Sequence, residues 1–266
     1  MRIIRKSKEI NSLFNSVKKT GFVPTMGSLH KGHESLINKS VKQNNVTFVS
    51  IFINPKQFNN KKDLKNYPKE INKDIQICKK CKVNYLFLPS YLEVYSWKVK
   101  QNKIPKINNL MEHKYRKGHF KGVIKVIEKL SSIIPANKMY LGEKDFQQLR
   151  IIEDYFAINK IKTKIIKCKI IRDKKGLALS SRNKFLDKNG LNKAREIINF
   201  IKLTKQKYNC VDTLIKIIKN YLIKNKISFD YLENINLKKF TISKKKFNSR
   251  IFIAFYINKI RLIDNI

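Results

Sequence analysis

The sequence lacks any long apolar segment, and it is poor in cysteine and in acidic residues. No stretch approaches the roughly 18 consecutive apolar residues that suggest a membrane span, so we expect no membrane partner. Residues 1–6 lack the long apolar centre and the cleavage site of a secretory signal, which predicts a cytoplasmic protein. Hydrophobic residues still make up 42% of the chain, which is typical of a folded globular protein.

The four cysteines do not form a recognisable metal or redox motif. Cys78 and Cys81 make a C-x-x-C pair, but they fall inside a helical pattern, and Cys168 and Cys210 are isolated. A structural zinc site usually needs four ligands at finger-like spacings, and a redox pair lies at the end of a strand and opens a helix. We therefore expect core or surface thiols and name no protein ligand for a metal.

Acidic residues number 19 against 59 lysines and arginines, which gives a formal charge of +40. A clustered charge of this size would favour a nucleic-acid partner, because lysine and arginine release counterions from phosphates. Here the lysines are spread through every segment and interleaved with asparagine and isoleucine. We interpret the charge as compositional drift toward A+T-rich codons and expect no specific nucleic-acid partner. A basic RNA-binding module with salt-sensitive adhesion stays open as an alternative.

Short apolar runs alternate with helical patterns through the first two thirds of the chain. We expect strands at residues 21–25, 46–53, 85–88, 139–141 and 165–171. Alternating strands and helices predict an α/β fold with a doubly wound parallel sheet, Rossmann-like, with ligands at the carboxyl ends of the strands. Helices are expected after His33 through Val41, around Ile75, at residues 123–134 and from Phe146. Residues 91–114 show no clear periodicity.

Beyond Leu186 the pattern changes to two lysine-rich amphipathic helices and short strands near residues 229–233 and 250–257. We therefore predict a larger domain at residues 1–186 and a smaller α+β domain at residues 187–266 that could act as a lid.

Two histidines mark the first candidate site. His30 and His33 lie where the glycine-containing loop after the first expected strand becomes a helix, beside backbone N–H groups expected to be unpaired. That arrangement suits a triphosphate, and histidine donors can stabilise charge on its α-phosphate. The H-x-x-H spacing alone also fits two partly exposed histidines or a zinc pair, although zinc pairs on helices are usually four apart with a Glu between, which this loop lacks.

Polar residues follow three further expected strands or turns. Lys144, Asp145 and Gln148 could hold phosphate and ribose oxygens, although an exposed ion pair at a helix start has the same pattern. Residues 180–182 offer hydroxyl groups and a guanidinium for the departing phosphates, or a simple helix cap. Asn54 and Gln57 are neutral amides that suit a substrate with hydroxyl and carboxylate groups, or ordinary turn residues around Pro55.

These segments together resemble one known family. Residues 24–33 match the block P-T-M-G-x-L-H-x-G-H of the pantothenate synthetase family, which also marks the wider HxGH nucleotidyltransferases. Residues 50–58 are similar to S-I-F-V-N-P-x-Q-F, residues 118–123 to G-H-F-x-G-V, and residues 142–149 to G-E-K-D-x-Q-Q-L. Residues 177–183 and 261–265 also fit, so the resemblance covers almost the whole chain.

The resemblance implies a set of site residues. The implied catalytic residues are His33, His30, Lys144 and Arg182. The implied ATP-binding residues are Met26, Gly27, Ser28, Leu29, His30, Lys31, Gly32, His33, Gly142, Glu143, Lys144, Asp145, Ile171, Leu179, Ser180, Ser181 and Arg182. Gln57 and Gln148 would bind pantoate, with Gln57 bordering the path of β-alanine, and Arg116 and His119 would lie near the active site.

The resemblance also implies an activity: ATP, accompanied by Mg²⁺, activates pantoate as pantoyl-adenylate, and β-alanine then attacks to give pantothenate, AMP and pyrophosphate. Members of the family commonly form homodimers. The main enzymatic alternative is another HxGH adenylyltransferase, against which the G-E-K-D-x-Q-Q-L block argues.

Overall fold

The computed structural model describes residues 1–14, 18–99 and 102–266, and these divide into two compact units. The first unit comprises Met1–Ile107 and Arg116–Lys169, and the second comprises Asn108–Tyr115 and Ile170–Ile266. The expected boundary after Leu186 therefore lies inside the second unit. The reason is that Leu177 and Leu186 pack in the core of the second unit, while an ion pair joins Arg172 to Asp264.

The first unit contains a six-stranded sheet in the order β1-β4-β3-β2-β5-β6, and each strand pairs parallel with its neighbours. Its strands are β1 Arg2–Ile4, β2 Thr20–Thr25, β3 Val46–Ile51, β4 Tyr85–Phe87, β5 Lys138–Gly142 and β6 Lys164–Cys168. The predicted parallel sheet is confirmed, and the strand it lacked is β1, whose first two residues are exposed, so that it has no buried apolar run.

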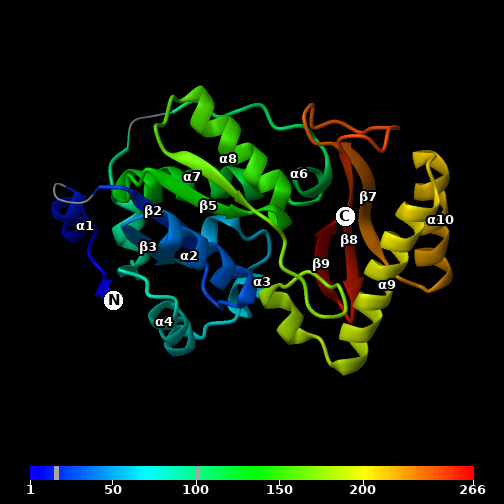
Figure 1. Ribbon diagram of the computed structural model, residues 1–266, viewed down its shortest axis with the longest axis horizontal. Helices are drawn as coiled ribbons and strands as arrows, with labels where there is room; N and C mark the ends of the chain where they lie inside the picture. The colour runs from blue at the N-terminus through cyan, green and yellow to red at the C-terminus, as the bar shows by residue number, and fades with distance from the viewer. Residues whose placement is uncertain (15–17, 100–101) are drawn as a thin grey trace. The chain divides into compact units, whose positions relative to one another are not determined.

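Helices connect these strands on both faces of the sheet (Figure 1). They are α1 Ser7–Phe14, α2 Lys31–Gln43, α3 Lys61–Lys65, α4 Ile71–Lys80, α5 Tyr91–Tyr95, α7 His119–Ile133 and α8 Phe146–Ile158, with 3-10 turns η1 Pro55–Gln57 and η2 Glu143–Asp145. The segment without periodicity, residues 91–114, contains α5 and most of α6 (Met111–Tyr115), which are too short to reveal a repeat. Residues 100 and 101 of that segment lie outside the described residues.

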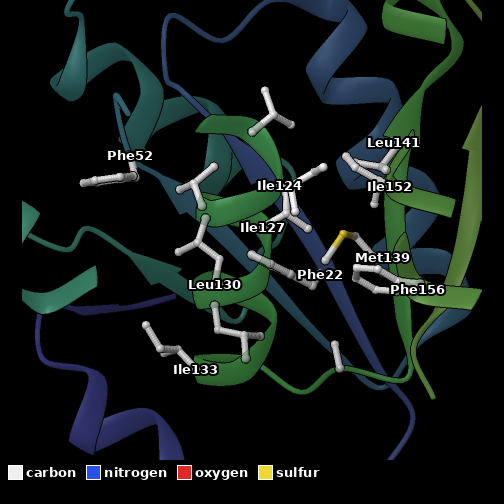
Figure 2. Close-up of a cluster of buried hydrophobic side chains, with 14 of the residues drawn as sticks. Phe22, Phe52, Ile124, Ile127, Leu130, Ile133, Met139, Leu141, Ile152 and Phe156 are labelled. Atoms are coloured by element: carbon white, nitrogen blue, oxygen red, sulfur yellow. The ribbon is translucent and has the colours of Figure 1, made fainter. Parts of the chain in front are cut away.

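Alternation along the strands builds two cores, one on each face of the sheet. Phe22 and Met139 pack with α7 and α8, and Figure 2 shows them facing Ile124, Ile127 and Phe156. Their strand neighbours Val23 and Tyr140 pack in a separate cluster with α2 and α4. Burial on both faces is what makes these strands read as nearly continuous apolar runs.

The cysteines of α4 belong to this second cluster. Cys78 and Cys81 are free and buried, and burial raises the pKa of Cys78 to about 12. The expectation of core thiols is confirmed for this pair. Among the described residues, no group of three or more His, Cys, Asp or Glu side chains could hold a metal ion.

The second unit is an α+β structure built on an antiparallel three-stranded sheet, β7-β8-β9. Its elements are α6, the 3-10 turn η3 Ser181–Phe185, α9 Lys188–Lys207, α10 Val211–Lys224, β7 Phe229–Asn236, β8 Ser249–Ile257 and β9 Ile260–Asn265. Helices α9 and α10 cover the sheet through a core that includes Ile198, Ile218 and Phe255 (Figure 1). No helix in the described parts of the chain is both long enough and apolar enough to cross a bilayer.

Candidate active site

The loop after β2 is the centre of the candidate site. β2 pairs with β3 on one side and with β5 on the other, all parallel, so the segments that follow these three strands leave the same edge of the sheet. From β2 the chain first adds β3 and β4 on one side and later adds β5 and β6 on the other. The position where the strand order reverses is the topological switch point, and α/β folds bind ligands there.

This loop has an unusual backbone. Gly27 has φ 80° and Ser28 has φ 51°, so two successive residues adopt left-handed conformations, the second at a cost because it carries a Cβ. Gly27, Ser28 and Leu29 are buried, whereas Met26 and His30 are partly exposed. The buried residues thus shape the loop.

A carboxylate from α4 holds the loop in this shape. Both oxygens of Asp74 accept backbone hydrogen bonds, from Ser28 N at 2.8 Å and from Leu29 N at 2.7 Å, and Asp74 is only 1% exposed. The Ser28 hydroxyl donates to Glu70 Oε2 at 3.3 Å. Sequence reasoning missed both acidic residues, because they lie more than 40 positions away from the loop.

The structure brings His30 and His33 together, with ring centroids 4.1 Å apart. His30 caps α2, and its Nδ1 accepts a hydrogen bond from Gly32 N at 3.1 Å. The Nδ1 atom of His33 accepts one from His30 N at 3.4 Å. The expectation that backbone N–H groups beside the histidines are unpaired is therefore wrong for Ser28, Leu29, His30 and Gly32, because carboxylate and imidazole acceptors already take them.

These hydrogen bonds fix the tautomer of both rings. A neutral imidazole has one acceptor nitrogen and one donor nitrogen. Because Nδ1 accepts from the backbone in His30 and in His33, the proton of each neutral ring is on Nε2. The loop therefore presents two Nε2–H donors, fixed by backbone contacts.

The turn after β3 contacts this loop directly. Asn54 and Gln57 are buried, and Asn54 Nδ2 donates to Gln57 Oε1 at 2.9 Å. Gln57 Nε2 in turn donates to the sulfur of Met26 at 2.9 Å. Tyr95, which sequence reasoning missed, donates its hydroxyl to Asn54 Oδ1 at 2.7 Å, and burial raises the pKa of this tyrosine.

The start of α7 supports the same turn. The carbonyl oxygen of Gln57 accepts from His119 Nδ1 at 2.7 Å, so the proton of a neutral His119 ring is on Nδ1. Its Nε2 then accepts from Arg116 Nη1 at 3.2 Å. The Arg116 and His119 block therefore reaches the site through Gln57, and His119 links the arginine to the turn.

The segment after β5 provides the remaining polar groups of the first unit. Lys144 lies in η2 with its side chain 18% exposed, and its Nζ lies 3.9 Å from Asp145 Oδ1. Asp145 is exposed, and Gln148 is partly buried in the first turn of α8. Gly142 is the last residue of β5, and Glu143 is the first residue of η2.

The other predicted nucleotide-binding residues belong to the second unit, where they form one small structure. Leu179 N donates to the Ile171 carbonyl oxygen at 3.0 Å, which closes a hairpin whose tip is Gly176 with φ 91°. Ser180 caps η3 through a hydrogen bond from Arg182 N to its Oγ at 3.3 Å. The structure thus joins Ile171 to residues 179–182 within this unit.

An ion pair missed by sequence reasoning anchors that hairpin. Arg172 donates to both carboxylate oxygens of Asp264 on β9, at 2.6 and 2.9 Å, and also to the Gly176 carbonyl oxygen at 3.1 Å. Nearby on β9, Arg261 makes a similar bidentate contact with Glu112 of α6, at 2.6 and 3.0 Å. These contacts explain why residues 261–265 carry a family-like block without being predicted site residues.

Comparison with known proteins gives one consistent result. The sequence pattern of the family described as pantoate-beta-alanine ligase matches residues 2–266. Pantothenate synthetases of two Francisella tularensis subspecies, novicida (strain U112) and mediasiatica (strain FSC147), are 41% and 42% identical over 275 residues, covering 100% of this chain and 97% of each relative.

Solved structures agree with the sequence relatives. The crystal structure of pantothenate synthetase from Thermus thermophilus superimposes with a TM-score of 0.91 at 27% identity, covering 100% of this chain and 99% of that one. Pantoate-beta-alanine ligase from Francisella tularensis, complexed with beta-gamma ATP and beta-alanine, has a TM-score of 0.83 at 39% identity, with 100% and 97% covered. With the family pattern matched from residue 2 to residue 266, the chain belongs to the pantoate-beta-alanine ligase family.

Proposed function

We propose that this ligase of pantoate and β-alanine binds ATP at the loop after β2 and works through a pantoyl-adenylate. The pantoate carboxylate attacks the α-phosphorus, the bond to the β-phosphate breaks, and pyrophosphate leaves. The neutral amine of β-alanine then attacks the acyl carbon, and AMP leaves as the amide forms. The crystallised relative that holds beta-gamma ATP and beta-alanine supports both ligand classes.

His30 and His33 carry the first step in this proposal. Their Nε2–H groups would donate to phosphate oxygens, where negative charge builds up during the displacement. The single observation behind this role is that both Nδ1 atoms accept backbone N–H groups, so both donors are fixed before the nucleotide arrives. Gly27, Ser28 and Leu29 would contribute by shaping the loop, since they are buried.

Gln57 and Gln148 are proposed to bind pantoate. Gln57 is held by His119 at its carbonyl oxygen and by Asn54 at its side-chain oxygen, so its orientation is set before substrate binds. An amide can donate to a carboxylate and accept from a hydroxyl group, and pantoate has both. Such preorganisation lowers the entropic cost of bringing carboxylate and phosphate together.

Lys144 and Arg182 would neutralise phosphate oxygens, and Asp145 would accept from ribose hydroxyls. The remaining proposed nucleotide contacts are Met26, Lys31, Gly32, Gly142, Glu143, Ile171, Leu179, Ser180 and Ser181. Mg²⁺ would enter with ATP and be held mainly by phosphate oxygens, a mode that requires few protein ligands. Its charge would assist the departure of pyrophosphate.

The region after Leu186 is proposed to exclude water from the adenylate, which is prone to hydrolysis. We also propose a cytoplasmic homodimer without a specific nucleic-acid partner, in keeping with the family resemblance and with the even spread of lysine.

Pantoate-dependent formation of AMP from ATP in the presence of β-alanine tests the proposal. The variant His33→Asn is informative, because the asparagine side-chain oxygen can still accept from His30 N while the Nε2–H donor of the imidazole is lost. We expect a fall in kcat of about 10²–10³-fold for this variant and a comparable fall for Lys144→Ala. Lys125→Ala, an exposed lysine on α7, should keep wild-type turnover. Wild-type turnover in both site variants would refute the assignment.

A further inference from the structure

The buried carboxylate of Asp74 has no role in the chemistry described above, yet it contacts the loop that carries both histidines. It is 1% exposed and lies on α4. It accepts hydrogen bonds from Ser28 N and Leu29 N, the two residues directly before His30. Burying a carboxylate is costly unless its oxygens are hydrogen-bonded, so an acidic residue at this position needs a reason.

The geometry of the contact supplies that reason. Two adjacent amides, Ser28 N and Leu29 N, point at the two oxygens of one carboxylate, at 2.8 and 2.7 Å. Hydrogen bonds to a charged acceptor are about twice as strong as neutral ones, and two in parallel fix direction as well as distance. The carboxylate therefore determines the orientation of the peptide units that lead into His30.

The backbone at this point needs such support. Ser28 has φ 51°, a left-handed conformation that residues other than glycine, asparagine and aspartate rarely adopt. A Cβ added at Gly27 would lie 3.0 Å from Asp74 Oδ2, so the chain also approaches the carboxylate closely. Strained backbone of this kind persists where its surroundings over-determine it.

The orientation of these peptide units affects the histidines through the start of α2. Leu29 is followed by His30, whose extended backbone (φ −144°, ψ 175°) caps α2 and whose N–H fixes the ring of His33. If the two peptide units before the cap reorient, both Nε2–H donors move. We propose that Asp74 is a positioning residue for the ATP-dependent step, holding the histidine loop in its reactive geometry without touching the substrate. This inference rests on the proposed function of the histidines.

The variant Asp74→Asn tests the role at nearly constant shape. An asparagine keeps one carbonyl oxygen for one amide but turns an NH₂ group toward the other, so a donor faces a donor. We expect kcat/KM for ATP in pantoate-dependent AMP formation to fall at least about tenfold. When synthetic pantoyl-adenylate and β-alanine are supplied instead, the rate should change by less than about threefold, because the ATP-dependent step is bypassed. Asp154→Asn on α8, where the carboxylate side chain is 39% exposed, is the matched control and should change neither rate.

A measurement independent of activity accompanies the kinetics. Amide hydrogen exchange at residues 28 and 29 should accelerate in Asp74→Asn, while amides of β2 and β3 keep wild-type protection. Two results for Asp74→Asn would overturn the positioning role. One is an equal fall in the rates of AMP formation and of the reaction from pantoyl-adenylate, and the other is faster amide exchange with an unchanged kcat/KM for ATP. A wild-type protein that forms no AMP would instead refute the proposed function and leave the exchange result interpretable.

If Asp74→Asn fails to fold, the double variant Ser28→Gly/Asp74→Asn replaces it. Glycine adopts the left-handed conformation at no steric cost, so the loop depends less on the carboxylate. We expect partial recovery of kcat/KM for ATP relative to the single variant where both fold. Where only the double variant folds, its kcat/KM for ATP should stay below the wild-type value. A wild-type value, together with wild-type amide exchange at residues 28 and 29 of the double variant, would refute the inference.

Discussion

Gly122 lies where α7 packs against the turn η1 that holds Gln57. An added Cβ would be 2.2 Å from the Lys56 carbonyl oxygen and 2.8 Å from Gln57 N, far inside van der Waals contact. The Gly122 carbonyl oxygen also accepts from Asn54 Nδ2 at 3.1 Å. At this position a glycine is required by space alone, since its helical backbone suits any residue.

We therefore expect Gly122→Ala to push α7 away from the turn and displace Gln57. The KM for pantoate should rise at least about tenfold, and the free energy of unfolding should fall by about 1–3 kcal/mol, as overpacking costs typically do. Steady-state kinetics with varied pantoate and urea titration check the two effects.

Lys121→Ala on the same helix serves as the control, because Lys121 is exposed. An unchanged KM for pantoate in Gly122→Ala would show that α7 does not fix Gln57.

At the residue scale, the sequence predicts the location of the two histidines, because that signal is local. His30 and His33 were expected on one face at a helix start, and the capping contacts place them there. Asp74 was missed because its partners Ser28 and Leu29 are about 45 positions away, and a single aspartate on an amphipathic helix looks like any solvated one. Contacts between distant residues leave no periodicity for a sequence pattern to reveal.

At the scale of elements, strand β9 anchors the hairpin at residues 171–179. Asp264 of β9 has a side chain only 2% exposed and accepts two hydrogen bonds from Arg172, which is itself largely buried. Removing one partner of a buried pair leaves the other charge uncompensated. Asp264→Asn should therefore lower the free energy of unfolding by about 2–3 kcal/mol, less than for a fully buried pair because Arg172 keeps some contact with water.

Urea unfolding followed by circular dichroism measures this loss. Asp212→Asn removes one negative charge from an exposed position on α10 of the same unit and should cost less than about 0.5 kcal/mol. Equal unfolding midpoints for the two variants would mean that the ion pair does not stabilise the hairpin.

Boundary residues, helix length and buried charges decide which elements the sequence reveals. Helix α7 was expected from Val123 and in fact begins at His119, because Gly118 rather than an apolar residue marks its start. The five-residue helices α5 and α6 were missed, as was β9, whose charged residues Arg261 and Asp264 interrupt its apolar alternation. In the fold, Arg261 is partly buried in an ion pair with Glu112, and Asp264 is buried in one with Arg172. A pattern of apolar and polar residues alone would assign both charges to the surface.

For the whole molecule, the domain boundary after Leu186 stays a prediction, whereas the compact units follow contacts between distant residues. The change in pattern after Leu186 is real, but residues 108–115 and 170–186 already belong to the second unit. Two ion pairs tie these segments to the second unit: Arg261 with Glu112, and Arg172 with Asp264. The partners lie about 90 or more positions apart in the sequence. Local composition cannot detect such pairings.

The charge of +40 is the dominant property at this scale. With 59 basic and 19 acidic residues, most lysines have no acidic partner to pair with, and the folded state gathers like charges more closely than the unfolded chain does. Self-repulsion of this kind destabilises the compact state, and added salt screens it once the Debye length falls to about 10 Å or less.

Raising sodium chloride from about 0.02 M to about 0.3 M should consequently raise the Tm by several degrees, measured by scanning calorimetry. Replacing sodium with potassium at equal ionic strength should give the same shift, because screening depends on ionic strength. Lys238→Gln and Lys239→Gln, both exposed, should raise the Tm at low salt and reduce the salt effect. A Tm that is constant or falls with salt would show that repulsion between lysines does not limit stability, so that their even spread already keeps them far enough apart.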